Sequence, residues 1–378
     1  MEKRDFPAPN TQGHYLLTLT GICGEFPAGL LSRLPGGVQY WEKVITELKK
    51  EKLLHTYYRD HLRGYRLGQR AKKVLLSEQS ECFSFFLTGK TDTNLLKSEV
   101  TRRLRLHRIA AATVTMQNAG VNIFRDEKPD VFAADGFKMG EAGENVFLAS
   151  PAFYSSREVK AIGLDAVKIR GSRMVGVLLA RSGVFTTYIG GTTPPEWDYR
   201  AEQRAKSLLS IILCRDRMAG QFDMSDIHGL ILCDGMEVLA QTLAGADTAK
   251  RCGFLLDGNY EHFYYLTNDH CGDVLLSLLC DADRQVAFRK VLLSELRSPS
   301  RSLPMEYDAV DKAGRPVLFA YLPDIPRLGR FLAGLSLHGR QGCIACFDFQ
   351  AQALESCCGK NVTLLPISFE QFERGFCP

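Results

Sequence analysis

The first 80 residues alternate between apolar stripes spaced as in a helix and short apolar runs of strand length. In residues 38–51 the apolar side chains recur at spacings of three and one, the pattern of an amphipathic helix. These apolar positions are Val38, Trp41, Val44, Ile45 and Leu48. Two shorter helices are predicted before it, at 15–20 and 28–34, because helix-ending glycine or proline residues follow each of them.

A hairpin is predicted directly after the helix at 38–51. Residues 53–59 and 64–67 are predicted as strands, and the polar stretch 60–63 between them has the length of a hairpin loop. A further helix is predicted from Gln69 onward. Helix, helix, helix, hairpin, helix is the order of a winged helix-turn-helix. The wing exit, 64–68, followed by a basic helix, resembles that of many bacterial winged-helix proteins.

Residues 81–120 are predicted as a connecting strand and a basic helix. The apolar run 82–87 precedes Gly89-Lys90-Thr91 and therefore looks like a strand entering a phosphate-binding loop. That loop requires glycine five residues before its Gly-Lys pair, where this chain has Ser84, so an ATPase is not expected. A long helix is predicted at 97–118. Three roles stay open for its arginines: extending a DNA-contacting surface, facing solvent, or making an acidic interdomain contact. These arginines are Arg102, Arg103, Arg105 and Arg108.

From about residue 121, strands alternate with helices, which predicts a mixed or parallel sheet covered on its faces. Strands are predicted at 146–148, 173–179, 183–189, 229–233, 253–256, 263–266, 317–321, 343–347 and 362–365. Helices are predicted at 199–219, 237–243, 271–279, 327–335 and 351–356. A surface linker is expected at 298–304, which is rich in serine and proline.

The predicted fold class is therefore α/β, or α+β overall. It consists of an N-terminal winged helix-turn-helix and a mixed α/β body for which a restriction-endonuclease-like fold stays open. The expected domains are a winged helix-turn-helix at 1–80, the connecting strand and basic helix at 81–120, a nuclease-like and inactive α/β domain at 121–220, and a C-terminal α/β domain at 221–378.

The composition is that of an ordinary soluble globular protein. Of the 378 residues, 45% are hydrophobic and 24% are charged, which argues against disordered or fibrous chains. No apolar run reaches the roughly 18 residues that would span a bilayer, and the first residues lack the apolar core of a signal peptide. The 12 cysteines are scattered, mostly within apolar runs, which suits a reducing compartment. A cytoplasmic protein without membrane contact is expected.

A structural zinc site is not expected at the cysteines near the C-terminus. Cys343 and Cys346 are three positions apart on a predicted strand and would point to opposite faces. No metal and no cofactor are therefore predicted, with Mg²⁺ reserved for the case of a nuclease.

Positive charge is concentrated near the N-terminus. Residues 37–73 hold ten Lys and Arg against four acidic residues, a net charge of +6. Residues 97–108 hold five against one, whereas the whole chain nets only +4. This polarity indicates an anion-binding end, and duplex DNA is the expected partner.

In a winged helix the third helix can enter the major groove while the wing lies along phosphates. The residues expected to contact the groove are Gln39, Tyr40, Lys43, Thr46 and Lys50. Those expected at the DNA backbone are Arg59, His61, Arg63 and Arg66. Acidic residues interspersed along the helix dilute this positive face, so a wing that binds protein instead of DNA remains an alternative.

Two weaker constellations lie in the body. Glu158 and Lys160 form a Glu-x-Lys pattern, and Glu202 and Lys206 follow at helical spacing. A metal-dependent nuclease sets acidic residues and a lysine around Mg²⁺, but it usually carries its Glu-x-Lys on a core strand. Glu202 and Lys206 are more simply explained as an ion pair on a helix surface.

The second constellation consists of acidic residues at the ends of predicted strands: Asp234, Asp257, Asp324 and Asp348. Ligands and metals gather at the carboxyl ends of strands in α/β sheets. Acidic residues also simply end strands, and this is the simpler explanation. The candidate catalytic residues are Glu158, Lys160, Glu202, Lys206 and Asp234.

The winged N-terminus resembles the replication-relaxation proteins of bacterial plasmids and integrative conjugative elements. The run 153–160 and the segment through the glycine hairpin to Trp197, Glu202 and Lys206 look like uncharacterised proteins of such elements in Firmicutes. The resemblance covers about the first 220 residues. It implies a DNA-binding winged helix fused to a nuclease-derived α/β domain, with replication or conjugation proteins as further partners.

Four hypotheses follow. The first is a DNA-binding accessory or replication protein of a mobile genetic element, for which a homodimer is left open. The second is a metal-dependent DNA endonuclease. The third is a transcriptional regulator whose α/β body senses a ligand, and the fourth is a winged helix that binds only protein.

Overall fold

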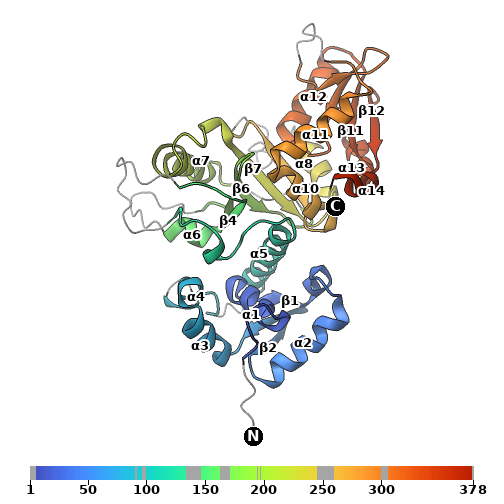
Figure 1. Ribbon diagram of the computed structural model, residues 1–378. Coiled ribbons are helices and arrows are strands. Elements are labelled where there is room, and N and C mark those ends of the chain that lie inside the picture. Colours follow the sequence, from blue (N-terminus) through green and yellow to red (C-terminus); the bar gives the residue numbers. More distant parts are fainter. Residues whose placement is uncertain are drawn as a thin grey trace. The chain divides into compact units, whose positions relative to one another are not determined.

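The computed structural model describes residues 6–89, 92–95, 99–132, 146–161, 171–193, 195, 197–244, 259–298 and 305–376. These residues adopt a mixed α/β fold with three sheets, which confirms the predicted α/β class (Figure 1). The chain divides into two compact units. The first comprises Met1–Asn118 and Ile123–Pro129, and the second comprises Ala119–Asn122 and Asp130–Pro378.

The first unit begins with the predicted run of helices and a hairpin. Its helices and strands, in chain order, are α1 (Gln12–Cys23), β1 (Phe26–Pro27), the 3-10 helix η1 (Ala28–Arg33), α2 (Val38–Lys50), β2 (Leu54–Arg59), β3 (Leu62–Leu67), α3 (Gln69–Glu78), α4 (Ser80–Leu87), α5 (Val100–Asn118) and the 3-10 helix η3 (Arg125–Glu127). The three strands form a small antiparallel sheet in the order β1-β3-β2.

The helices of this unit follow the apolar pattern of the chain. Helix α2 buries Trp41, Ile45 and Leu48, and the Trp41 indole N–H donates to the Pro35 carbonyl at 2.9 Å. The side chain of Thr11 caps the N-terminus of α1 by accepting a hydrogen bond from an amide of the first turn. At its other end the chain turns at Gly24, whose φ of 81° favours glycine.

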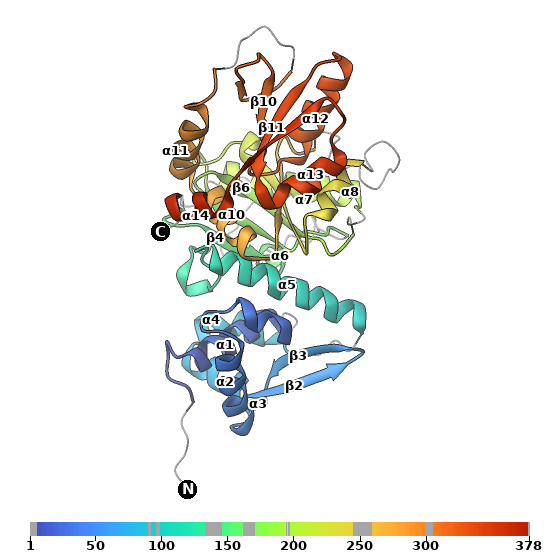
Figure 2. The same cartoon turned by 90° about the vertical axis from the view of Figure 1, so that its right-hand side faces the viewer.

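The hairpin loop is shorter than predicted. Asp60 and His61 both have positive φ, as the two central residues of a type I′ turn require, and β3 already begins at Leu62. Arg63 therefore lies on a strand and pairs with Tyr58 across the hairpin. Figure 2 shows this hairpin extending away from α1, α2 and α3.

Two predicted strands are wrong. Residues 82–87 belong to helix α4, which buries Phe83, Phe86 and Leu87 on one face. A short apolar run fits a buried helix as well as a strand, and here the spacing of the buried side chains is helical. Val146–Leu148 lies outside any strand, and the Phe147 side chain is 78% exposed. Some predictions fall on residues outside the described ranges. They are the strand at 253–256, Lys97 at the start of the long helix, Asp257, and 299–304 of the linker.

The second unit contains a five-stranded sheet in the order β4-β5-β6-β7-β8. Its strands are β4 (Ala152–Ser155), β5 (Gly176–Ala180), β6 (Gly183–Ile189), β7 (Ile227–Cys233) and β8 (Phe263–Thr267). Strands β4, β5 and β6 form an antiparallel meander, and β5 and β6 correspond to the strands predicted at 173–179 and 183–189. Strand β7 then pairs in parallel with β6, and β8 pairs in parallel with β7.

Helices connect these strands, as the alternating pattern predicts. They are α6 (Ser156–Ala161), α7 (Tyr199–Leu209) with its π-helical continuation η4 (Ser210–Arg217), the 3-10 helix η5 (Met224–Asp226) and α8 (Glu237–Ala244). The parallel connection from β6 to β7 runs through α7, which packs Ala205, Leu208 and Leu209 into the core of the unit.

The chain ends in a four-stranded sheet in the order β12-β11-β10-β9. Its strands are β9 (Ala309–Val310), β10 (Pro316–Phe319), β11 (Gly342–Phe347) and β12 (Val362–Ile367). The helices of this region are α10 (His270–Cys280), α11 (Ala282–Leu293), α12 (Ile325–Leu337), α13 (Asp348–Cys357) and α14 (Phe369–Phe376). Aromatic rings of Phe288, Phe347 and Phe372 pack together between α11, β11 and α14.

Candidate nucleic-acid interface

The outer face of α2 carries all five residues that the sequence assigns to the groove. Gln39, Tyr40, Lys43, Thr46 and Lys50 are exposed, opposite the buried stripe of the same helix. A 13-residue helix is about 20 Å long, so these side chains are spread along a surface of that length.

Exposed lysines on this face are not neutralised. Among the described residues, no carboxylate lies within ion-pair distance of Lys43, Lys49 or Lys50. Glu42 and Glu47 are exposed on the same helix and reduce its net charge. The face is therefore polar and mixed in charge, with cations available for an anionic partner.

The hairpin presents three of its four predicted contact residues to solvent. Arg59, His61 and Arg63 are exposed near its tip. The Arg59 guanidinium forms an exposed ion pair with Asp60 at 3.3 Å, and Arg63 hydrogen-bonds the Tyr65 hydroxyl. An exposed ion pair of this kind is weak, so Arg59 can exchange Asp60 for phosphate at little cost.

Arg66 does not belong to this surface. Its side chain is 1% exposed, and its guanidinium donates to Glu25 through Nε at 2.9 Å and Nη2 at 2.6 Å. The prediction that Arg66 contacts the DNA backbone is wrong, because on β3 its side chain points into the unit, whereas that of Arg63 points outward.

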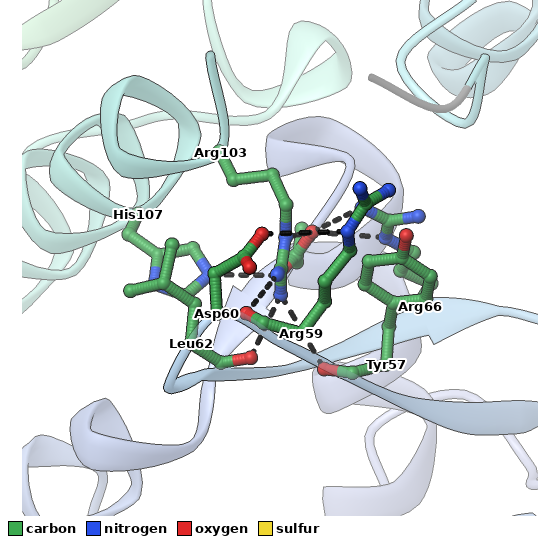
Figure 3. A network of polar contacts seen from close by, with 8 residues as sticks. Tyr57, Arg59, Asp60, Leu62, Arg66, Arg103 and His107 are labelled. Atoms are coloured by element: carbon green, nitrogen blue, oxygen red, sulfur yellow. Dashed lines mark hydrogen bonds and ion pairs between the residues drawn. The ribbon is translucent and has the colours of Figure 1, made fainter. Parts of the chain in front are cut away.

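Glu25 is the centre of a buried polar network that the sequence does not reveal. Figure 3 shows Arg66, Arg103 and His107 of this network. Besides Arg66, it binds Arg103 of α5, whose Nη2 donates to Glu25 Oε1 at 2.6 Å. The His107 ring nitrogen Nε2 lies 2.7 Å from the same oxygen. Gly64 leaves room for the carboxylate, since a Cβ at that position would lie 2.4 Å from Glu25 Oε1.

Arg103 also holds the hairpin from inside. Its guanidinium donates to the backbone carbonyls of Arg59 at 2.9 Å and Leu62 at 3.0 Å, on either side of the turn. The Tyr57 ring lies 3.8 Å from the Arg66 guanidinium carbon and 4.6 Å from that of Arg103. Arg103 was expected on a DNA-contacting or solvent-facing surface or in an acidic interdomain contact. It is instead fully buried and paired with Glu25 of the same unit. Arg102, Arg105 and Arg108 are exposed.

The network keeps the Glu25 carboxylate ionised. Burial alone would raise the pKa of Glu25, but hydrogen bonds from His107, Arg103 and Arg66 lower it to about 2. Two guanidiniums share one buried carboxylate, and backbone carbonyls of the hairpin accept from Arg103 as well. This arrangement fixes the hairpin to β1 and α5 and so determines where Arg59 and Arg63 are presented.

Glu158 and Lys160 do not form a nuclease-type site. They lie on helix α6 instead of a core strand. Glu158 accepts a hydrogen bond from the Ser155 amide at 2.7 Å, and its own amide donates to Ser155 Oγ, which makes a capping box at the start of α6. The Ser-x-x-Glu spacing is the sequence signal for this structural role.

Glu202 and Lys206 are not a surface ion pair. Glu202 is fully buried and accepts hydrogen bonds from Ser172 Oγ at 2.8 Å and the Arg173 amide at 2.6 Å. Lys206 donates to the backbone carbonyl of Asn259. Burial raises the pKa of Glu202 and lowers that of Lys206. The explanation as a surface pair is wrong because α7 turns this face into the core.

The acidic residues at strand ends do not come together. Asp234 is exposed after the carboxyl end of β7. Asp324 lies at the opposite end of the parallel pair, where its carboxylate accepts from the Phe263 amide at the start of β8. Asp348 follows β11 in the other sheet. These positions do not build a shared metal or catalytic centre.

Sequence reasoning missed a histidine pair beside Asp324. His262 Nδ1 lies 2.6 Å from the Asp324 carboxylate, and the rings of His262 and His228 are 5.2 Å apart. A hydrogen bond from the His262 ring to the Asp324 carboxylate raises the pKa of His262, whereas burial lowers the pKa of His228 to about 4. Nothing in the spacing of 228, 262 and 324 indicates this contact.

No protein-family model, no curated protein and no solved structure matches this chain. Within the described residues, no three His, Cys, Asp or Glu side chains gather as metal ligands would. A helix with the length and apolarity to cross a bilayer is likewise absent from the described part of the chain.

Proposed function

We propose that the first unit is a winged helix-turn-helix that binds duplex DNA through α2 and the β2–β3 hairpin. The observation that carries this proposal is the pairing of two exposed elements. Each buries its apolar side in one core and turns its cations outward: Lys43 and Lys50 on α2, Arg59 and Arg63 on the hairpin. The element order and the β1-β3-β2 sheet support it, because both are those of a winged helix.

The Glu25 network adds support of a different kind. A wing tip that contacts phosphate must be held in a fixed geometry. Arg103 binds the carbonyls on both sides of this turn, so the tip does not depend on the two strands alone. We therefore assign Arg103 and Glu25 a positioning role and leave contact with DNA to the exposed cations.

Within this proposal the protein acts as an accessory or replication protein of a mobile genetic element. This part rests on the resemblance of the N-terminal region to replication-relaxation proteins. The second unit then serves assembly or partner contact, since neither Glu158 and Lys160 nor Asp234 lies in a nuclease-type arrangement.

The test is binding of a labelled duplex by the full chain at two salt concentrations. Neutralised phosphates make log K fall linearly with log salt, with a slope of about −0.9 per phosphate contact in B-DNA. We expect the variant Lys43→Glu/Arg63→Glu to bind at least about tenfold more weakly and to show a slope shallower by about 1 to 2.

A matched control changes the same charges elsewhere. Arg340 and Lys360 are exposed in the second unit, and Arg340→Glu/Lys360→Glu should leave DNA binding within about twofold of wild type. Absence of salt-dependent DNA binding by the wild-type chain would refute the proposal and favour a protein-binding wing. Equal losses in both double variants would show that only the total charge matters.

A further inference from the structure

The first unit contains a cavity of about 450 Å³ that the nucleic-acid interface does not use. It is walled by the N-terminal turns of α1, the α3–α4 junction, the end of α5 and the 3-10 helix η3. This volume falls within the range of sites that hold small organic molecules. None of the residues assigned to DNA contact lines it.

The charged side chains that line the cavity are both acidic. Asp126 and Glu127 lie together on η3, and lysine and arginine are missing from the lining residues. Burial, followed by the neighbouring Asp126 charge, raises the pKa of Glu127. A bound cation would relieve this repulsion. The negative lining contrasts with the net positive charge of residues 37–73 and 97–108 of the same unit.

Neutral polar and aromatic groups complete the walls. His14 is 8% exposed, and burial lowers its pKa, which favours the neutral ring. The Tyr15 hydroxyl donates to Gln117 at 2.8 Å, and the rings of Phe83 and Phe124 supply apolar surface. The cavity therefore offers carboxylates and hydrogen-bonding groups together with faces for an apolar body.

Two lining residues also contact the core of α2. The Tyr15 and Trp41 ring centroids are 6.1 Å apart, and the Pro35 carbonyl accepts the Trp41 indole N–H. A molecule in the cavity would thus touch side chains that pack directly against the predicted groove-facing helix.

We propose that this cavity binds a small organic cation, an amine, amidine or guanidinium carried on an apolar body. The cationic group pairs with Asp126 and Glu127, and the apolar body lies against Phe83 and Phe124. This site is independent of DNA binding, and either property can exist without the other.

The test is calorimetric titration of the full chain with three cations: phenethylamine, benzamidine and agmatine. Phenethyl alcohol and phenylacetate keep the body of phenethylamine but replace its charge with a neutral or negative group. We expect saturable binding of at least one cation, with binding of phenethylamine about tenfold or more tighter than that of phenethyl alcohol, and no binding of phenylacetate.

Variants connect this binding to the cavity. Asp126→Asn/Glu127→Gln should weaken cation binding about tenfold or more, whereas Glu42→Gln/Glu47→Gln removes the same charges from α2 and should leave it unchanged. Gln12→Trp places a large ring at an exposed lining position and should block entry. Failure of all three cations to bind saturably overturns the proposal. So does binding that persists in the acidic variant and in Gln12→Trp.

Discussion

Two buried glutamates, one in each unit, lie in opposite surroundings. Glu25 and Glu202 are both fully buried. Two guanidiniums and a histidine surround Glu25, and despite burial their hydrogen bonds lower its pKa to about 2. Glu202 accepts hydrogen bonds from uncharged Ser172 and a backbone amide, and burial raises its pKa. The comparison shows that the partners, and not depth alone, decide whether a buried carboxyl is held as the anion.

The difference also sets the pH dependence of each unit. The pKa of folded Glu25 lies below its ordinary value of 4.5, so its stabilisation is complete above that value and is lost as pH falls toward 2. Glu202 has the opposite sign, because its raised pKa makes stability fall as pH rises above 4.5. One glutamate therefore favours neutral pH, and the other favours mild acid.

The largest effect is expected for Glu25→Gln. It leaves Arg66 and Arg103 buried without their counter-ion, which costs about 3–5 kcal/mol of the free energy of unfolding of the first unit. Denaturant unfolding can be followed at Trp41 alone in a Trp197→Phe background, since the chain has two tryptophans and each unit holds one. Asp60→Asn, in the exposed pair with Arg59, is the control and should cost less than about 1 kcal/mol. If both variants lose a similar free energy of unfolding, the buried network contributes no more to stability than an exposed ion pair.

His228 offers a second way to sharpen the comparison. Its pKa falls from 6.5 to about 4 through burial, so the folded state resists protonation and the second unit loses stability as pH drops from 6.5 toward 4. At pH 5 this loss is about 2 kcal/mol relative to pH 8. We expect His228→Leu to reduce the difference in stability between pH 8 and pH 5 by about that amount. Unfolding followed at Trp197 in a Trp41→Phe background measures it, and an unchanged pH profile would contradict a neutral buried His228.

The smallest effect is expected for Glu202→Gln. The amide retains an oxygen for the Arg173 amide and an NH₂ group that can donate to Ser172, while no cation loses its partner. The free energy of unfolding of the second unit at pH 7 should change by less than about 1 kcal/mol. Its decline at rising pH should flatten. If this variant destabilises as strongly as Glu25→Gln, the two glutamates are not opposites, and Glu202 is held as a required anion.

Much of the fold could be predicted from the regular spacing of apolar residues along the chain. The stripe of Trp41, Ile45 and Leu48 predicts α2 to within a residue of its end, and strands β5 to β8 of the second unit follow from short apolar runs between turn residues. Strand β4 was not among the predicted strands. The run at 82–87 failed because six apolar-rich residues fit a buried helix or a strand equally well. Only packing against the other helices of the first unit distinguishes the two.

The candidate site could be predicted only where the exposure of a side chain follows from its neighbours in the sequence. Exposure of Lys43 and Lys50 follows from their position opposite an apolar stripe. The burial of Arg66 and Arg103 does not, because their partner Glu25 is 41 and 78 residues away in the chain. A local pattern shows that a residue carries charge, but a distant carboxylate decides whether that charge reaches the surface.

The path of the chain between its two units has a practical consequence for dissecting the protein. Ala119–Asn122 belong to the second unit, and Ile123–Pro129 return to the first before the chain departs again at Asp130. A fragment cut after Asn118 would lose Arg125, which lies over the Phe85 ring, and Lys128, which is buried against the Ile123 carbonyl. A fragment starting at Asp130 would lose Asn122, which pairs with Ala152 beside β4. No single cut in the chain leaves both units intact. The two units are therefore better distinguished by a spectroscopic probe in each one than by expressing them as separate fragments.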